Sequence, residues 1–97
     1  MKPLAWNANK NRWLIDERSV SFEDVVFHMG TGDLLDDYEH PNQERYPGQR
    51  VFAVRIRGYV CLVPYVDSEE HYFLKTIMPS RKATRKYLRS THGRSET

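Results

Sequence analysis

Most of the side chains that could bind an anion lie at the end of the chain. From Lys75 onward there are seven basic residues and one acidic residue, Glu96. The basic residues are Lys75, Arg81, Lys82, Arg85, Lys86, Arg89 and Arg94. Those between residues 81 and 89 are spaced so that they would share one helix face, which could follow a phosphate backbone. The same face could instead be covered by an acidic segment of a partner protein.

The middle of the chain carries the opposite charge. Between Asp16 and Glu44 nine residues are acidic and one, Arg18, is basic. The net charge of +2 hides this asymmetry, which is typical of proteins that contact nucleic acid or another anionic partner. The alternative is a solvated basic helix beside an acidic loop, with basic residues such as Arg81 paired to carboxylates of the same chain.

His40 and Glu44 are the candidates for proton transfer, because either side chain can accept a proton. Both stand in a polar stretch, 37–48, whose His-Pro-Asn and Tyr-Pro-Gly runs are typical of a loop. His71, which begins an apolar run, is a third candidate. A lone histidine is nevertheless more often a structural residue than a catalytic one.

Three tyrosines, Tyr46, Tyr65 and Tyr87, could stack on nucleobases, and each stacked base contributes roughly 1–3 kcal/mol. Each could equally be a core tyrosine with a bonded hydroxyl. The acidic cluster around Asp36 matches no spacing of metal ligands, and there is no glycine-rich phosphate loop. We therefore expect neither a metal nor a nucleotide cofactor.

Capping signals and periodicity predict the elements that would position these residues. Ser21 can cap a helix as part of a capping box with Asp24, and Gly30 is the expected left-handed stop. The predicted elements are a short strand at 3–6, helices at 8–18 and 22–29, a possible strand at 34–38, strands at 50–57, 59–66 and 71–78, and a helix at 81–89. Pro64 lacks the N–H that a middle strand needs, so it should mark a bulge or the end of its strand.

This order predicts an α+β fold with two N-terminal helices, an antiparallel sheet of three to four strands, and a C-terminal helix. We expect the helices to gather on one side of the sheet. A length of 97 residues with 39% hydrophobic content suits one domain. Its predicted bounds are 1–90, and 91–97 should be a polar, flexible tail.

The composition favours a cytoplasmic protein. No stretch approaches the roughly 20 apolar residues that span a bilayer, and the first residues lack the apolar core of a signal peptide. The single cysteine, Cys61, excludes an internal disulfide. We expect no membrane contact.

Two motifs resemble those of the BrnT toxins. Trp6-Asn7-Ala8-Asn9-Lys10, followed by Val20-Ser21-Phe22-Glu23, resembles the family's Trp-Asp-x-x-Lys run, helix and Gly-Val-Ser-Phe-Glu run. Near the other end, Ser80-Arg81-Lys82-Ala83 resembles the Ser-x-Arg-x-Ala run that opens the family's last helix. The likeness covers nearly the whole chain from Trp6 to Leu88. The chain departs from the family between the two helices, where Leu14, Arg18 and Ser19 stand in place of Asn-x-x-x-His-Gly.

The resemblance implies a RelE-like fold and the toxin half of a type II toxin–antitoxin system. Such toxins cleave RNA without a metal and arrest translation. The cognate antitoxin is typically a ribbon-helix-helix DNA-binding protein, so operator DNA would be bound only through it. The toxin is then expected in a hetero-oligomer with the antitoxin.

Site residues follow from this resemblance and from charge. Arg81 would bind the phosphate at the start of the last helix, where backbone N–H groups also favour an anion. Arg50 and Lys10 match family positions and would supply further cations. His40 and Glu44 complete the predicted catalytic set with Arg81 and Arg50. The predicted RNA-binding residues are Lys10, Lys75, Lys82, Arg85 and Tyr87. Alternatively, Arg50 is a solvated strand-edge charge and Lys10 a solvated helix lysine.

Two other functions remain open. RelE-like folds also occur as gyrase poisons, so a module that binds RNA, DNA or protein without chemistry is the alternative. A degenerate toxin retained as a corepressor is a third. Convergence of Arg81 and Arg50 with a histidine or glutamate in one concave site would favour the ribonuclease, and scattered charges would favour the binding module.

Overall fold

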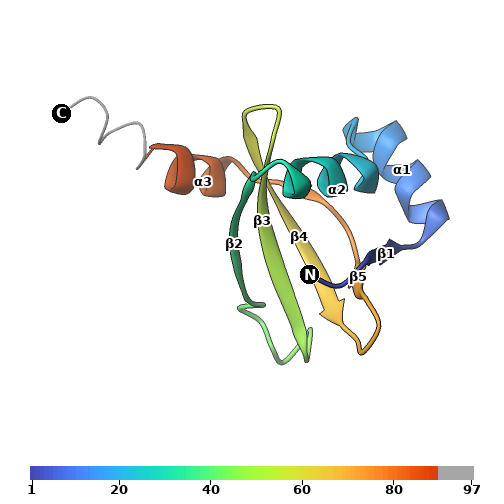
Figure 1. Cartoon of the computed structure of the whole chain (residues 1–97). Coiled ribbons are helices and arrows are strands. Elements are labelled where there is room, and N and C mark those ends of the chain that lie inside the picture. Colours follow the sequence, from blue (N-terminus) through green and yellow to red (C-terminus); the bar gives the residue numbers. More distant parts are fainter. Residues whose placement is uncertain (90–97) are drawn as a thin grey trace.

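The computed structural model describes residues 1–89, apart from the side chain of Arg89. These residues form six strands, three short α-helices and a π-helical turn (Figure 1). The elements are β1 (Leu4–Trp6), α1 (Ala8–Arg18), α2 (Phe22–Gly30), β2 (Leu34–Glu39), β3 (Gln49–Ile56), β4 (Tyr59–Asp67), β5 (Tyr72–Leu74), β6 (Met78–Pro79), α3 (Arg81–Thr84) and η1 (Arg85–Arg89). The tail predicted at 91–97 lies outside the described residues. No helix among residues 1–89 has the length and apolar character that crossing a membrane requires.

The predicted helix starts are confirmed. Asn7 accepts a hydrogen bond from the backbone N–H of Lys10 at 3.0 Å, and Ser21 and Asp24 form both bonds of the capping box. The predicted stop at Gly30 is wrong. Gly30 is still helical, and the glycine with a left-handed backbone is Gly32, at φ +92°.

The sheet is mixed, so the predicted antiparallel sheet of three to four strands is wrong. Its order is β1-β5-β4-β3-β2, and β6 also pairs with β4. The N-terminal strand β1 runs parallel to β5, with Leu4 opposite Tyr72, whereas the other pairs are antiparallel. Sequence periodicity gave no indication of this parallel pairing because a three-residue strand carries almost no pattern. The α+β class is confirmed.

Pro64 disturbs the neighbouring strand rather than its own. It lies inside the continuous strand β4, opposite Val51. On the other side of β4, however, the strand predicted at 71–78 is broken into β5 and β6 by the irregular segment 75–77. These three residues stand opposite only two, Val63 and Pro64, as in a bulge. Pro64 can accept the backbone N–H of Lys75, at 2.8 Å, but has none to donate, so the ladder is interrupted there.

Helices cover both faces of the sheet, contrary to the prediction that they gather on one side. In Figure 1, α1 and α2 lie toward the right and α3 extends to the left. The main core lies between the sheet and the two N-terminal helices, and includes Leu14, Phe22, Val25, Phe52, Val54, Val63, Tyr65 and Ile77. A smaller cluster on the opposite face joins Ala53 and Val60 to Ala83 of α3, with Tyr87 and Leu88 packed against it. Ala53 and Phe52 are neighbours on β3, so their side chains point to opposite faces.

A buried asparagine joins the two N-terminal helices. Asn11, 8% exposed, donates to the Glu23 carboxylate at 2.8 Å and accepts the backbone N–H of Phe22 at 2.7 Å. The first bond is the main reason why the pKa of Glu23 lies below its ordinary value. The first turn of α2 is therefore fixed by a side chain of α1.

Replacing this residue should destabilise the domain. Asn11→Ala leaves the buried N–H of Phe22 without its partner, so we expect a loss of roughly 1–3 kcal/mol of unfolding free energy in urea titrations. Asn9→Ala, on an exposed position of the same helix, is the matched control. A loss no larger than about 0.5 kcal/mol, the size of an ordinary surface substitution, would contradict this role.

Candidate functional site

The broken strand opposite Pro64 opens a pocket on the sheet face that α1 and α2 leave uncovered. Its volume is about 150 Å³, and it is lined by His40, Tyr46, Gln49, Pro64, Lys75, Thr76 and Met78. Two residues predicted for the site, His40 and Lys75, are therefore brought together although 35 positions separate them in the sequence. The irregular segment 75–77 places Lys75 and Thr76 on the pocket wall.

A short polar network fixes the loop between β2 and β3. The Gln43 side-chain amide donates to the carbonyls of His40 at 2.8 Å and Gln49 at 3.0 Å, and its oxygen accepts the N–H of Gly48 at 3.0 Å. The backbone N–H of His40 also donates to the Gln49 carbonyl at 3.0 Å, which closes the base of the loop. One side chain thus joins both ends of the loop and positions His40 and Gln49.

The hydrogen bonds of His40 determine which of its nitrogens can donate. Its Nδ1 accepts the backbone N–H of Asn42 at 3.0 Å. A neutral imidazole that accepts at Nδ1 carries its hydrogen on Nε2, so Nε2 is a donor. Because Nδ1 already accepts a hydrogen bond, the ring nitrogen left to contact a ligand is Nε2, and the prediction that His40 accepts a proton stays a prediction. The His40 ring also lies against Tyr46, with 4.5 Å between the ring centroids.

A second pocket, of about 210 Å³, lies on the same sheet face beside α3. It is lined by Tyr38, Leu62, Ser80, Lys82, Ala83, Lys86 and Tyr87. Lys82 and Tyr87, both predicted to contact RNA, are among these residues. Lys86 is further fixed by the Tyr87 ring, whose centroid is 5.2 Å from Nζ.

Two polar contacts anchor the C-terminal segment to the sheet. Thr84 Oγ1 accepts the N–H of Val60 at 2.8 Å and donates to the Ser80 carbonyl at 2.7 Å. Tyr87 donates its hydroxyl to Asp36 of β2 at 2.6 Å. This bond is the main reason why the pKa of the Asp36 carboxyl lies below its ordinary range. Tyr87 therefore acts first as an anchor, and its hydroxyl is already used within the chain.

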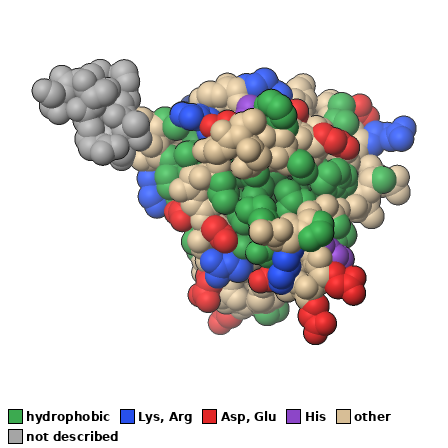
Figure 2. Space-filling view, in the orientation of Figure 1, with side chains coloured by type: hydrophobic (Ala, Val, Ile, Leu, Met, Phe, Trp, Pro, Cys, Tyr) green, Lys and Arg blue, Asp and Glu red, His purple; other side chains and the backbone are tan. Residues whose placement is uncertain are grey.

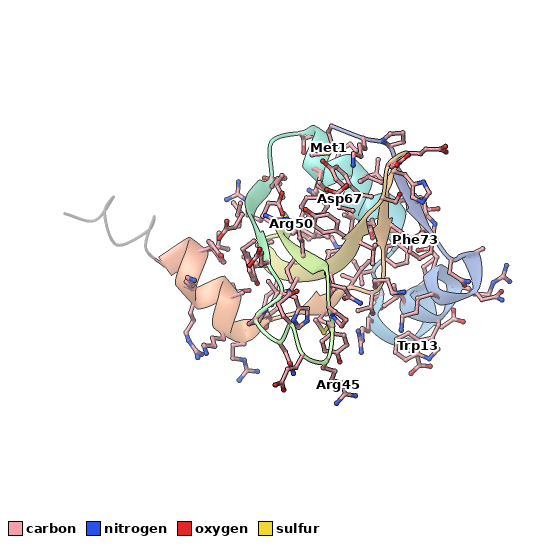
Figure 3. The ribbon with its side chains drawn as sticks, turned by 90° about the horizontal axis from the view of Figure 1, so that it is seen from below. Met1, Trp13, Arg45, Arg50, Asp67 and Phe73 are labelled. Carbon is pink, nitrogen blue, oxygen red and sulfur yellow. The ribbon has the colours of Figure 1, made fainter. Side chains whose placement is uncertain are left out.

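Arg50 does not belong to either pocket, so the predicted convergence of Arg50 with Arg81 and a histidine is not found. Its Nε is 3.2 Å from both the Asp37 carboxylate and the Tyr65 hydroxyl, and Tyr65 in turn donates to Asp37 at 2.6 Å. These contacts, the Tyr65 bond first, raise the pKa of Arg50. Tyr65 stacks on Phe52 in the main core. Figure 3 shows Arg50 beside the sheet, well apart from Arg45 at the tip of the loop.

The remaining predicted residues lie outside the pockets. Lys10 belongs to α1, where its Nζ is 4.4 Å from the centroid of the exposed Trp13 ring. Arg81 and Arg85 are exposed on α3 and η1, and Glu44 is exposed in the loop. The α-helical part of this segment is a single turn, and Ser80 already caps the N–H of Ala83 at 3.0 Å.

Three carboxylates of the acidic middle segment pair with arginines of β3 and of the turn that follows it. Asp37 pairs with Arg50 at 3.2 Å, Asp33 with Arg55 at 3.0 Å, and Asp24 with Arg57 at 3.5 Å. Among the described residues, no ion pair involves Lys75, Arg81, Lys82 or Arg85. The alternative in which Arg81 pairs with this acidic segment is therefore wrong within residues 1–89, and these cations face solvent.

Sequence reasoning missed the polar residues that complete the first pocket and its loop. Gln49 and Thr76 line the pocket, while Asn42 and Gln43 set the loop. The density of side-chain amides between His40 and Gln49 was a signal for a side-chain-bonded loop. Within residues 1–89, no group of histidine, cysteine and carboxylate side chains could hold a metal ion.

An apolar surface lies on another part of the molecule. A groove of about 570 Å³ between the N-terminus and α2 is lined by Met1, Lys2, Pro3, Leu4, Trp6, Val26, Met29 and Gly30. Figure 2 shows the apolar side chains gathered in the middle of this face. Phe27 beside it is 63% exposed. Exposed apolar patches of this kind are typical of protein–protein contacts.

No protein-family model matches the sequence, and neither a curated protein nor a solved structure shows significant similarity to it. The function is therefore inferred from the fold and from the geometry of the two pockets.

The Tyr87–Asp36 bond should make stability depend on pH. The pKa of Asp36 is lowered in the folded state. The bond therefore stabilises the folded state fully above a pH of about 4, the ordinary pKa of an aspartate, and this stabilisation is lost as pH falls through the lowered pKa. We expect Tyr87→Phe to reduce the unfolding free energy by about 1 kcal/mol at pH 7, and by less near pH 3.

Urea titrations at the two pH values measure this difference. Tyr59→Phe, at an exposed tyrosine of the β3–β4 hairpin, is the control. An equal loss from Tyr87→Phe at both pH values would show that the bond to the ionised carboxylate does not stabilise the C-terminal segment.

Proposed function

We propose that this protein is a ribonuclease toxin of a type II toxin–antitoxin system, with its active site in the pocket between His40 and Lys75. The observation that carries the proposal is that an N–H donor and an ammonium group line one pocket. On the same sheet face, no ion pair within residues 1–89 involves Lys75 or Lys82. The motifs at 6–10, 20–23 and 80–83, which resemble those of the BrnT toxins and imply a RelE-like fold, support the same proposal.

The chemistry would be transesterification within RNA. The ribose 2′-oxygen attacks the adjacent phosphorus, the bond from phosphorus to the 5′-oxygen breaks, and the products are a 2′,3′-cyclic phosphate and a 5′-hydroxyl. One proton must leave the 2′-hydroxyl and another must reach the 5′-oxygen. Negative charge increases on the phosphoryl oxygens between these events, and fixed donors aimed at that charge lower the barrier.

Each pocket residue has a role in that step. The Lys75 ammonium neutralises the developing charge, the role first predicted for Arg81. The Nε2–H of His40 donates to a phosphoryl oxygen, because its Nδ1 is occupied by Asn42. The Tyr46 ring offers a face on which a base can stack. Glu44, exposed in the same loop, remains the candidate for the proton acceptor.

The second part of the proposal is neutralisation by a protein antitoxin, expected to be a ribbon-helix-helix protein that alone contacts operator DNA. The apolar groove between β1 and α2 supports a protein partner, since most of its wall is apolar, including Leu4, Trp6 and Met29, and Lys2 is the one charged side chain within residues 1–89 that lines it. The groove lies apart from the His40 pocket, so one partner could occupy it without entering the active site.

A non-catalytic RNA-binding module is the second candidate, and one observation favours it. Arg50 is held by Asp37 and Tyr65 and does not meet Arg81, so the two arginines expected to share the phosphate are separated. Such a module would use the same exposed cations to bind RNA without cleaving it.

Induced expression distinguishes these two functions. The wild type should arrest growth and cleave total RNA. Lys75→Ala should lose both effects while remaining folded, and Arg12→Ala, at an exposed position of α1, should keep them. Purified wild type should also cleave RNA in the presence of a chelator. Undisturbed growth and intact RNA with well-expressed wild type would exclude the ribonuclease and leave the binding module.

Substitutions of His40 test its role as a donor. Glutamine presents an N–H close to the position of Nε2, so His40→Gln should keep much of the cleavage rate. His40→Ala should reduce that rate by roughly 10²-fold, the usual effect of removing one such donor. Equal losses in both variants, measured on a defined RNA, would show instead that His40 accepts a proton.

A further inference from the structure

We propose that the pocket beside α3 is a second nucleotide subsite, so that the sheet face on which α3 packs binds two successive nucleotides of single-stranded RNA. This inference rests on the proposed function, because it takes the His40 pocket as the first subsite. The second subsite is the 210 Å³ pocket that Tyr38, Leu62 and Lys82 line.

The strands place the two pockets side by side on one face. Tyr38 lines the second pocket and His40 the first, two positions apart along β2 and its extension. Leu62 and Pro64 show the same offset along β4. Residues at positions i and i+2 of a strand share a face and lie about 7 Å apart, roughly the length of one extended nucleotide.

A single side-chain pair marks the boundary between the pockets. Leu62 of the second pocket is paired in register with Met78 of the first. Both are partly accessible, with Met78 38% exposed, whereas Val51 beneath the face is 3% exposed. An extended strand could thus cross this apolar boundary with one base on each side of it.

The second pocket has the chemistry of a base site with its own phosphate contact. The Tyr38 ring, Leu62 and Ala83 give it flat and apolar walls, and Lys82 is an exposed cation beside them. Burial first, and then the nearby Asp36 carboxylate, raise the pKa of Tyr38, so its hydroxyl stays neutral. The first pocket repeats this combination with Tyr46 and Lys75.

The geometry favours single-stranded RNA over a duplex. Each pocket is small, with a volume of about 150 Å³ or 210 Å³, so a base can enter only if it is unstacked from its neighbours. Unstacked bases held on aromatic side chains are the usual mode of single-strand recognition. Stacking of the second base should raise the affinity by about tenfold, or roughly 1.4 kcal/mol, which is within the usual range for one stacked base.

Affinity as a function of ligand length tests the inference. The probes are fluorescently labelled 2′-O-methyl RNAs of one, two and three nucleotides, which lack the attacking hydroxyl and cannot be cleaved. Wild-type protein should bind the dinucleotide about tenfold more tightly than the mononucleotide. In Lys82→Glu/Lys86→Glu the mononucleotide affinity should stay within about twofold, while this tenfold gain disappears.

The controls separate failure of the subsite from failure of the proposed function. Arg12→Glu, at an exposed position of α1 that has no predicted role in binding, should bind all three probes like the wild type. The second subsite alone would be overturned if the double variant binds the mononucleotide and still binds the dinucleotide about tenfold more tightly. An equal loss of affinity for all three probes would also overturn it. No binding of any probe by folded wild type would overturn the proposed function as well. A thermal melt of each variant checks that the two lysine substitutions leave the fold intact.

Discussion

The missing N–H of Pro64 is the constraint on which the rest of this structure depends. A continuous strand cannot pair with β4 past this residue, so residues 75–77 leave the sheet and β6 resumes the pairing one position out of step. The segment is nevertheless well held. Lys75 donates its N–H to the Pro64 carbonyl at 2.8 Å, Ile77 is fully buried, and the Ile77 carbonyl accepts Arg18 of α1 at 2.7 Å. The irregularity therefore produces a fixed pocket wall.

The distribution of ion pairs explains how a nearly neutral chain can present a basic surface. The arginines of β3 and of the β3–β4 turn pair with Asp24, Asp33 and Asp37, three of the nine acidic residues of the middle segment. Lys75 and Lys82 then remain available within residues 1–89. Interactions between exposed cations and phosphates are strongly screened by salt, so RNA binding on this face should weaken steeply as ionic strength rises.

Local signals in the sequence predicted the helices well, because caps act over three or four residues. Asn7, Ser21 and Ser80 all cap as expected. The sequence also showed that Pro64 had to disrupt pairing, but not on which strand, since that depends on which side of β4 its nitrogen faces. The pairing of strands that are far apart in the sequence could not be predicted either. The parallel contact of β1 with β5 and the placement of α3 on the opposite face both follow from tertiary packing.

The candidate site was predicted in part. His40 and Lys75 were both among the residues predicted from the sequence, and the structure places them at one pocket. Arg50 was assigned to the site by resemblance, and its position on the other face follows from strand alternation once the register of β3 is known. The role of His40 as a donor depends on the hydrogen bond from Asn42, which no spacing rule contains. The Gln43 network that holds this loop likewise appears only in three dimensions.

The most direct test of the account is to locate bound RNA on the protein by NMR. Backbone amide shifts of 15N-labelled protein would be followed while a short, uncleavable 2′-O-methyl RNA is added. If RNA binds in the two pockets, the largest shift changes should occur in the loop between His40 and Gln49, at Lys75 and Thr76, and at Lys82. Changes confined to α1, α2 or the surroundings of Arg50, or no saturable change at all, would contradict it.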